Sequence, residues 1–199
     1  ASIVNLDSAA AGTGSTNVYL DATSNNHHGR DYISASGDTG CIGAGAVFDG
    51  TNDYIGIADS ASLSSPQITV SAWINPQQNA PAGNQTARQF LLSKDVTGGT
   101  RDWSLQLYNN SNTWNCSLSI AVGGGAPTSY GCGVITAYTW SNIVATYDGS
   151  YARIYVNGVL AVASSLNSGS LTNSANSLML GLREGESTYF NGLMDEVRI

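Results

Sequence analysis

Apolar and polar residues alternate along short stretches of this chain with a period of two. In the stretch 68–74, Ile-Thr-Val-Ser-Ala-Trp-Ile, the first, third, fifth and seventh residues are apolar. Such alternation is typical of a β-strand with one face against a core. No window of eleven or more residues shows the spacing of an amphipathic helix. The pattern therefore predicts an all-β protein.

The same pattern places the strands. The predicted strands are 18–20, 46–48, 54–57, 68–74, 90–93, 103–108, 116–122, 139–147, 152–156, 178–182 and 193–199. Three dipeptides favour the positive φ angles of tight hairpins: Asp49-Gly50, Asp148-Gly149 and Asn157-Gly158. Many short strands at this spacing predict a sandwich of two sheets. Residues 75–89 lack periodicity, and a loop of that length is usually mobile or functional.

The last predicted strand carries an acid on its apolar side. The period of two places Asp195 on one face with Leu193, Val197 and Ile199. Burying an unpaired carboxylate is costly, so an inward Asp195 implies a partner. That partner is a cation, a cluster of hydrogen-bond donors, or a proton.

Composition narrows the range of ligands. Only 11% of the residues are charged, against about 25% in an average protein, and the net charge is −7 with one lysine, Lys94. Such a surface repels phosphate backbones and anionic lipids, so we expect no nucleic-acid partner. The apolar runs are too short to cross a bilayer, so we expect no membrane insertion. Divalent cations and neutral polar ligands such as sugars suit this surface.

Three cysteines are present, at positions 41, 116 and 132. Cys116 opens an alternating strand and Cys132 closes the glycine-rich stretch 123–131, so the two are placed to meet across a hairpin. We expect a disulfide there, contributing roughly 3 kcal/mol of stability. Two buried free thiols are the alternative. Cys41 is left unpaired, and the cysteines lack the spacing of a zinc site.

Six segments, taken in order, resemble a known family. They are AVFDGTNDYI at 46–55, ITVSAWINP at 68–76, WSNIVATYDG at 140–149, IYVNG at 154–158, LG at 180–181 and GLMDEVRI at 192–199. They are similar to the successive blocks of a laminin-G-like domain of the concanavalin A-like lectin/glucanase superfamily. The resemblance implies an all-β, concanavalin A-like jelly-roll sandwich of two curved antiparallel sheets. It also implies that residues 1–199 are a single module of a larger secreted or cell-surface protein.

The resemblance further implies a calcium site. Residues 21–29, Asp-Ala-Thr-Ser-Asn-Asn-His-His-Gly, resemble the family's calcium turn and offer oxygen ligands that suit calcium. The expected ligands are the carboxylates of Asp21 and Asp195, an oxygen of Asn26 and the backbone carbonyl of His28, with Ser24 and Asp49 as further candidates. The alternative is a turn stabilised by its own hydrogen bonds, without a metal ion. In that alternative Asp49 is the first residue of a separate turn.

A second group is a candidate ligand-binding rim. Its members are Asp95, Arg101, Asp102, Trp103, Arg183, Glu184, Glu186 and Tyr189. In the pentraxins, distant relatives of the family, the loops roughly equivalent to 94–102 and 183–188 supply carboxylates to calcium-mediated ligand binding. A sugar or second metal site is one interpretation of the rim, and surface ion pairing is the other.

Aromatic rings stack on the C–H faces of sugars, which makes tryptophans candidates for ligand contact. Trp114 lies in the polar stretch 109–115 and is the first candidate for a stacking residue. Trp103 shares a face with Leu105 and Leu107, which favours a place in the core, although the rim includes it.

Catalysis is not expected from the acidic residues. Glu184 and Glu186 have the spacing that paired acids have on a strand, but Gly185 lies between them and the stretch 181–187 has the composition of a loop. We therefore expect a non-catalytic, calcium-stabilised module that binds a polysaccharide or another glycan. The alternatives are a protein-directed adhesion or scaffold domain and, less favoured, a polysaccharide-active hydrolase or lyase.

Overall fold

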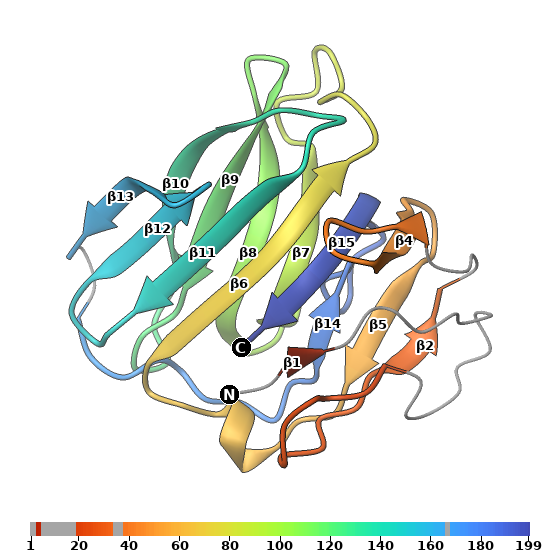
Figure 1. Cartoon of the computed structure of the whole chain (residues 1–199). Coiled ribbons are helices and arrows are strands. Elements are labelled where there is room, and N and C mark those ends of the chain that lie inside the picture. The colour runs from red at the N-terminus through yellow and green to blue at the C-terminus, as the bar shows by residue number, and fades with distance from the viewer. Residues whose placement is uncertain (1–2, 5–18, 34–37, 166–167) are drawn as a thin grey trace.

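A computed structural model describes residues 3–4, 19–33, 38–165 and 168–199. These residues form two antiparallel sheets that face each other as two layers (Figure 1). The eight-stranded sheet has the order β13-β12-β11-β6-β15-β4-β3, with β1 paired to β15. The seven-stranded sheet has the order β10-β9-β8-β7-β14-β5-β2. The expected all-β jelly-roll sandwich is confirmed.

The strands are short and follow one another closely along the chain. The eight-stranded sheet contains β1 Ile3–Val4, β3 Asp38–Thr39, β4 Ala44–Asp49, β6 Ile68–Pro76, β11 Ser141–Tyr147, β12 Ala152–Val156, β13 Val159–Ser164 and β15 Asn191–Arg198. The seven-stranded sheet contains β2 Arg30–Tyr32, β5 Tyr54–Ile57, β7 Arg88–Asp95, β8 Arg101–Asn110, β9 Thr113–Ile120, β10 Thr128–Ile135 and β14 Leu178–Leu180. A single 3₁₀ turn, η1 Ala61–Leu63, is the one helical element of the described residues, and no helix among them is long and apolar enough to span a bilayer.

The core lies between the two sheets and follows the alternation in the sequence. In β6, Val70, Ala72 and Ile74 are fully buried, while the residues between them face outward and are only partly covered. In β5, Ile55 and Ile57 are buried in the same way. Burying an aliphatic side chain of this size contributes about 1.5–3 kcal/mol, so the inward residues of each strand hold the layers together.

Two of the three predicted hairpins are present. Asp148-Gly149 joins β11 to β12, and Asn157-Gly158 joins β12 to β13. Both Asn157 and Gly158 have positive φ angles, 51° and 79°, as a two-residue hairpin requires. The prediction for Asp49-Gly50 is wrong, because β4 and β5 belong to different sheets and this dipeptide carries the chain across the sandwich.

Two longer strands escaped the sequence pattern for physical reasons. Strand β13 is the edge of its sheet, and its side chains are exposed or half-exposed throughout, so no apolar period marks it. Strand β10 is also an edge, and Gly131 and Gly133 interrupt its alternation at a bulge. That bulge places Cys132 beside Cys116 of β9. The two are joined in a disulfide with their Cα atoms 5.2 Å apart, as predicted.

Strand β15 departs from the alternation that the sequence predicts. Its pairing with β6 shifts register between Asp195 and Arg198, and Glu196 has a φ angle of 51°. Because of this bulge, the core residues of the strand are Met194 and Val197. Of the predicted apolar face, Val197 is in the core and Ile199 packs against it, and Asp195 is buried, but Met194 takes the place of Leu193.

Candidate functional site

The outer face of the seven-stranded sheet carries one continuous row of paired residues. Residues that pair across strands point to the same face, and the pairing registers connect all seven strands. From β2 to β10 the row is Arg30, Gly56, Met179, Ser93, Ser104, Ser119 and Ser129. The neighbours of the row along the strands, such as Ile55 and Leu105, point into the core. This transverse row therefore faces away from the core, and small or polar side chains predominate in it. Ser93, Ser104 and Ser119, in the middle of the row, are nevertheless buried.

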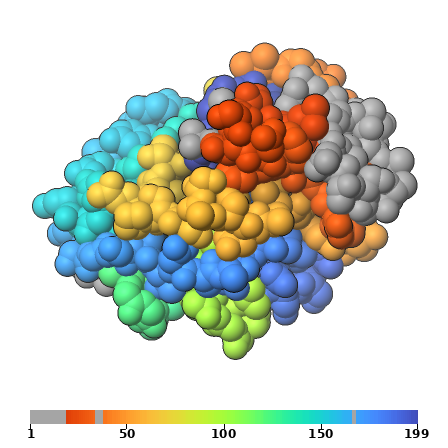
Figure 2. All heavy atoms as spheres, turned by 90° about the horizontal axis from the view of Figure 1, so that it is seen from below, coloured from red at the N-terminus to blue at the C-terminus, as the bar shows by residue number. Residues whose placement is uncertain are grey.

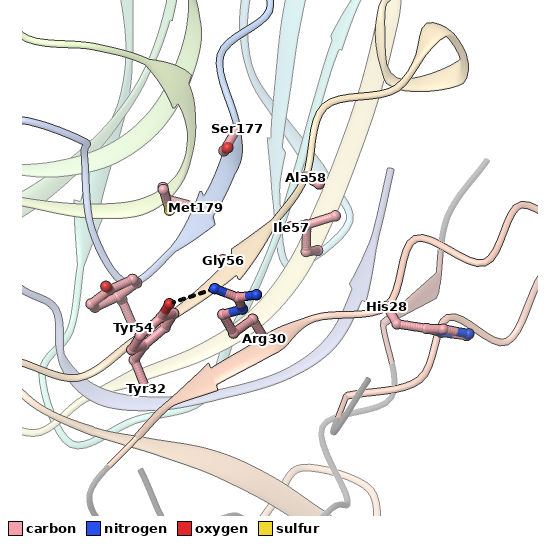
Figure 3. Close-up of a pocket in the computed structure, with 9 residues that line it drawn as sticks. All are labelled: His28, Arg30, Tyr32, Tyr54, Gly56, Ile57, Ala58, Ser177 and Met179. Carbon is pink, nitrogen blue, oxygen red and sulfur yellow. Dashed lines mark hydrogen bonds between the residues drawn. The ribbon is translucent and has the colours of Figure 1, made fainter. Parts of the chain in front are cut away.

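A hollow of about 410 Å³ lies at the β2 end of the row (Figure 3). Tyr32 and Tyr54 pair across β2 and β5, and their rings stack with centroids 4.4 Å apart at an angle of 12°. Arg30 Nη1 donates a hydrogen bond of 3.3 Å to the Tyr32 hydroxyl oxygen. The rest of the lining is formed by His28, Gly56, Ile57, Ala58, Ser177 and Met179. The hollow thus presents a flat aromatic pair beside a cation.

A larger hollow of about 550 Å³ lies between the loop that follows β6 and the segment 183–189. The loop is the non-periodic stretch that the sequence marked as mobile or functional. Asn109 fixes it in place, because the Asn109 side-chain amide donates to the carbonyls of Pro81 (2.7 Å) and Asn84 (2.6 Å). Tyr189 lines this hollow, and it also contributes to the raised pKa of Tyr54 in the first hollow. Tyr54 has its pKa raised by burial first and by Tyr32 and Tyr189 next, so its hydroxyl keeps its proton.

Four residues of the predicted rim converge in an ion-pair cluster. Arg101 Nε contacts Asp95 Oδ1 at 2.7 Å, and Arg183 Nε lies 3.4 Å from Asp95 Oδ2. Arg183 Nη1 also contacts Glu186 Oε1 at 2.8 Å. The ion pairing considered as the alternative is therefore present, with Asp95 and Arg183 buried and Arg101 and Glu186 partly exposed. Burial lowers the pKa of Arg183 and raises the pKa of Asp95, against the attraction between the two.

The other residues of the rim lie apart from the cluster. Glu184 is exposed, and its backbone carbonyl accepts the Thr97 N–H. Gly185 has a φ angle of 81° outside any strand, which confirms the loop expected between Glu184 and Glu186. Tyr189 is half-buried in the larger hollow.

Three predicted ligand-binding side chains are buried instead of exposed. Trp114 is 2% exposed, packs in the core, and donates its indole N–H to the Gln78 carbonyl. The loop that follows β6 therefore covers a ring that looked solvated in the sequence. Trp114 nevertheless lines the larger hollow, so its contact with a ligand stays a prediction. Trp103 is a core residue, as its shared face with two leucines indicated. Asp102 is 1% exposed and belongs to a separate network at the lower edge of the sandwich.

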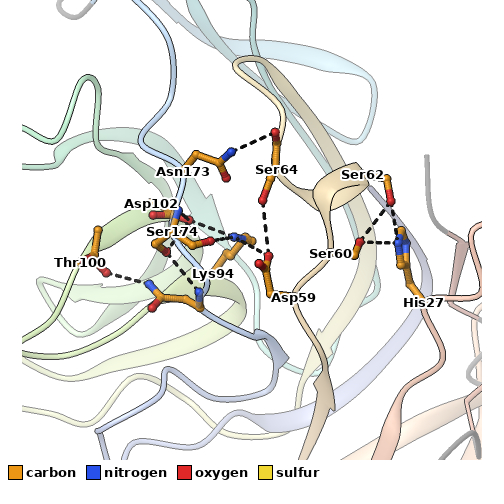
Figure 4. A network of polar contacts seen from close by, with 11 residues as sticks. His27, Asp59, Ser60, Ser62, Ser64, Lys94, Thr100, Asp102, Asn173 and Ser174 are labelled. Carbon is orange, nitrogen blue, oxygen red and sulfur yellow. Dashed lines mark hydrogen bonds and ion pairs between the residues drawn. The ribbon is translucent and has the colours of Figure 1, made fainter.

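Figure 2 shows this lower edge, where the segments 19–33, 58–67 and 168–177 lie side by side. A polar network runs beneath them (Figure 4). At its centre Lys94 is 1% exposed and contacts Asp59 Oδ1 (3.0 Å), Asp102 Oδ2 (3.1 Å) and the Ser174 carbonyl (2.6 Å). All three donors of the only lysine are therefore used. The network ties β7, β8 and two loops together.

The same edge holds a chain of Ser, His and Asp side chains. The His27 Nε2 atom lies 2.7 Å from Ser60 Oγ and 2.8 Å from Ser62 Oγ. On the other side of the ring, His27 Nδ1 is 3.6 Å from Asp21 Oδ2, beyond hydrogen-bond distance. Asp21 Oδ2 instead accepts the His27 backbone N–H. The arrangement therefore fixes the turn to η1, and the carboxylate does not orient the imidazole as in a catalytic triad.

The two acids expected to bind calcium are satisfied separately. Asp21 accepts hydrogen bonds from the backbone N–H groups of Thr23 (2.9 Å) and His27 (3.0 Å), and the Thr23 hydroxyl contacts both of its oxygens. Asp195 accepts the N–H groups of Ile42 (2.8 Å) and Glu196 (2.7 Å). The partner of Asp195 is thus a pair of donors, one of the three alternatives that the sequence left open.

The remaining candidate ligands also make local contacts. The Asn26 amide donates to the Ser24 carbonyl, and the His28 ring accepts the Asp21 N–H. Asp49 accepts the N–H groups that follow it, as the first residue of a turn does. No group of three or more His, Cys, Asp or Glu side chains within the described residues is arranged to hold a metal. In this arrangement the side chains fit a hydrogen-bonded turn better than a calcium ion.

Comparisons with known proteins agree with the sandwich. The family model described as the Concanavalin A-like lectin/glucanases superfamily matches residues 49–199. This chain belongs to that superfamily. A comparison with curated protein sequences finds no match.

Several solved structures have a similar fold at low sequence identity. Domain 4 of AbnA, an extracellular arabinanase from Geobacillus stearothermophilus solved in complex with arabinotriose, has a TM-score of 0.62 and 21% identity, covering 98% of this chain and 92% of that one. The binding domain of Paraclostridial Mosquitocidal Protein 1 has a TM-score of 0.73 and 14% identity, covering 98% and 48%. A chain of botulinum neurotoxin type C, which depends on interaction with two ganglioside molecules to enter cells, has a TM-score of 0.66 and 11% identity, covering 98% and 46%. This chain thus spans about half the length of the toxin chains, and at these identities the similarity concerns the fold.

Proposed function

We propose that this superfamily member is a non-catalytic module that binds a polysaccharide or another glycan on the outer face of its seven-stranded sheet. The observation that carries the proposal is the stacked Tyr32–Tyr54 pair in a hollow on this face. Aromatic rings offer a flat apolar surface at low conformational cost, and sugars present such a surface on their C–H faces. Arg30 and His28 in the same hollow are polar groups that could bond sugar hydroxyls.

The solved relatives support the same class of ligand. The arabinanase domain was solved with arabinotriose and is matched over 92% of its length, so this fold accommodates a glycan ligand in one distant protein. The neurotoxin depends on gangliosides for cell entry, but this chain matches only 46% of that chain, so the ganglioside interaction is not assigned to the shared part. An extracellular location fits the disulfide between Cys116 and Cys132, since such bonds persist in oxidising compartments.

A binding role explains the acidic residues better than catalysis does. Retaining glycoside hydrolysis uses two carboxyl groups about 5–5.5 Å apart at the scissile bond. Glu186 is engaged by Arg183 and by the Thr97 hydroxyl, whereas Glu184 is exposed at a loop tip. The two side chains therefore have different surroundings, and neither occupies a strand position.

Calcium remains a prediction that belongs to this proposal. The resemblance of residues 21–29 to the family's calcium turn supports it, and the hydrogen bonds already made by Asp21 weigh against it. A protein-directed adhesion domain is the second candidate function. A glycan array that stays blank with and without calcium would favour that second candidate.

The proposal is tested by replacing Tyr54 with alanine. We expect Tyr54→Ala to weaken binding of the best glycan ligand by roughly tenfold, which corresponds to about 1.4 kcal/mol of lost stacking. The measurement is isothermal titration calorimetry with oligosaccharides selected on a glycan array, arabino-oligosaccharides included. Tyr138→Ala is the matched control, because Tyr138 is exposed in the loop between β10 and β11.

Two results would contradict the proposal. One is equal affinity of the Tyr54→Ala and Tyr138→Ala variants for the ligand. The other is the release of reducing sugar from any bound polysaccharide, since turnover is incompatible with a non-catalytic module.

A further inference from the structure

Three of the six arginines of this chain surround one small hollow on the outer face of the seven-stranded sheet. The hollow has a volume of about 160 Å³, and Arg88, Arg101 and Arg183 line it together with Ser104 and Gln106. The chain as a whole carries a net charge of −7. Positive groups are therefore concentrated at one point of a protein that is otherwise acidic.

The acids beside this hollow neutralise only part of its charge. Asp95 is shared by Arg101 and Arg183. Among the arginines of the described residues, Glu186 pairs with Arg183. Arg88 is exposed and makes no ion pair among the described residues. In the ion pairs at this hollow, two carboxylates thus serve two of the three guanidinium groups, and Arg88 is left outside them.

Arg183 has hydrogen-bonding capacity that the protein does not use. It is 7% exposed and lies over the Phe90 ring, 5.4 Å from the ring centroid. Its Nη2 atom is buried and has no hydrogen-bond partner in the described structure. Native proteins rarely leave a buried charged donor unsatisfied. Repulsion from Arg101 and Arg88 also contributes to the lowered pKa of Arg183, after burial. A negatively charged acceptor at this point would satisfy the Nη2 donor and would reduce the repulsion among the three guanidinium groups.

We propose that this arginine hollow binds the carboxylate of an acidic sugar residue, as in a uronic acid. The inference rests on the proposed glycan-binding function and specifies its ligand class. A guanidinium group is planar and matches a carboxylate with two parallel hydrogen bonds. Ser104 and Gln106 form part of the lining of the same hollow, where both are buried and the Gln106 amide donates to the Ser117 hydroxyl. Arg88 and Arg183 also line the 550 Å³ hollow, which joins this position to the rest of the glycan surface.

The test compares uronic-acid oligosaccharides with the same oligosaccharides after chemical reduction of their carboxyl groups to alcohols. Isothermal titration calorimetry of the whole 199-residue chain measures both forms at 50 mM and 500 mM NaCl. We expect the acidic form to bind at least about tenfold more tightly at low salt, and its advantage to shrink at high salt. A protein with net charge −7 would otherwise repel an acidic ligand, so this preference points to a local site.

Arginine variants test whether the preference for the acidic form comes from this hollow. Arg88→Gln and Arg183→Gln are expected to bring the affinity for the acidic form close to that for the reduced form. Arg183→Gln removes a partner of buried Asp95, so Arg88→Gln, whose side chain is exposed, is the variant that leaves the fold intact. Arg153→Gln is the matched control, because Arg153 lies on β12 of the opposite sheet and the change removes the same charge.

The outcomes separate this inference from the proposed function. Equal affinity for the acidic and reduced forms overturns the acidic-ligand inference and leaves glycan binding in place. A preference for the acidic form that Arg88→Gln and Arg183→Gln do not change also overturns it. Failure of the wild-type chain to bind either form, or any glycan on an array, overturns the proposed function and this inference together.

Discussion

Lys94 illustrates how a single residue can organise an edge of the sandwich. It is the only lysine of a chain with few charges, and nothing in its sequence neighbourhood predicts that it is buried. Its partners, Asp59, Asp102 and Ser174, come from three separate segments. A buried ion pair is costly to break, because removing one partner leaves the other charge in a medium of low polarity.

We expect Lys94→Met to destabilise the fold by about 3–5 kcal/mol, because Asp102 would remain buried without its cation. Urea unfolding followed by tryptophan fluorescence measures the change. The double variant Lys94→Met/Asp102→Asn should recover part of the loss, since the buried charge is then absent. A loss below about 1 kcal/mol for Lys94→Met would show that Asp102 finds other partners.

The roles of individual residues were harder to predict from the sequence than the strands or the fold. The sequence indicated that Trp103 belongs to the core, but it gave no sign that the loop after β6 would cover Trp114. It marked Arg183 and Glu186 as neighbours of interest, and the ion pair confirms that they meet. Tyr32 was missed because its strand has only three residues, although the outward position of Tyr54 in the predicted strand 54–57 was a usable signal.

At the scale of single elements, alternation was a good guide wherever a strand has one buried face. The bounds of β5 and β12 agree with the sequence prediction, because their apolar residues alternate without interruption. Alternation failed at β15, where a bulge with positive φ at Glu196 reverses the side-chain direction. A bulge is set by pairing with neighbouring strands, so the strand's own sequence does not reveal it.

The β11–β12 hairpin has a pH-sensitive turn. Arg153 holds the pKa of the Asp148 carboxyl down at about 2 by a side-chain hydrogen bond, helped by the N–H groups of Tyr151 and Ser150. In the unfolded chain an aspartate has a pKa of about 3.9. The folded-state pKa is the lower one, so Asp148 stabilises the fold above about pH 4, and this contribution is lost as pH falls from 4 to 2.

We therefore expect Asp148→Asn to lower the melting temperature at pH 7 and to match the wild type near pH 2. Melting curves by circular dichroism between pH 2 and pH 7 measure the difference. Arg153→Gln removes the main hydrogen-bond donor and should lose most of the same pH dependence. A melting difference that stays constant over the whole range would rule out this role for Asp148.

At the scale of the whole molecule, six weak sequence blocks in order were enough to predict the superfamily and the two-sheet sandwich. Their order along the chain is itself informative, because it reflects the order in which strands enter the sheets. The ligand surface was not predictable in the same way. Arg88 and Arg101 lie on neighbouring strands and Arg183 lies in the segment that follows β14, so only the folded sheet brings the three to one hollow.

Calcium would act on the stability of the molecule as a whole. If an ion binds the native state near Asp21 and Asp195, its removal should lower the melting temperature by mass action. Differential scanning fluorimetry with excess EGTA, and then with added Ca²⁺ or Mg²⁺, measures this. Asp195→Ala should be less stable even in EGTA, because the N–H groups of Ile42 and Glu196 lose their acceptor. A melting temperature that EGTA leaves unchanged in the wild type would refute the calcium prediction.

The transverse row also sets a length scale. Its six gaps between neighbouring strands, each about 4.8 Å, add up to roughly 29 Å. One sugar ring touches only a small part of that distance, so a ligand that reaches both ends must be a chain. The two ends also differ chemically, with stacked tyrosines at β2 and a serine at β10. Under the proposed function, binding to this face would therefore depend on the length of the glycan chain and on the direction in which the chain runs.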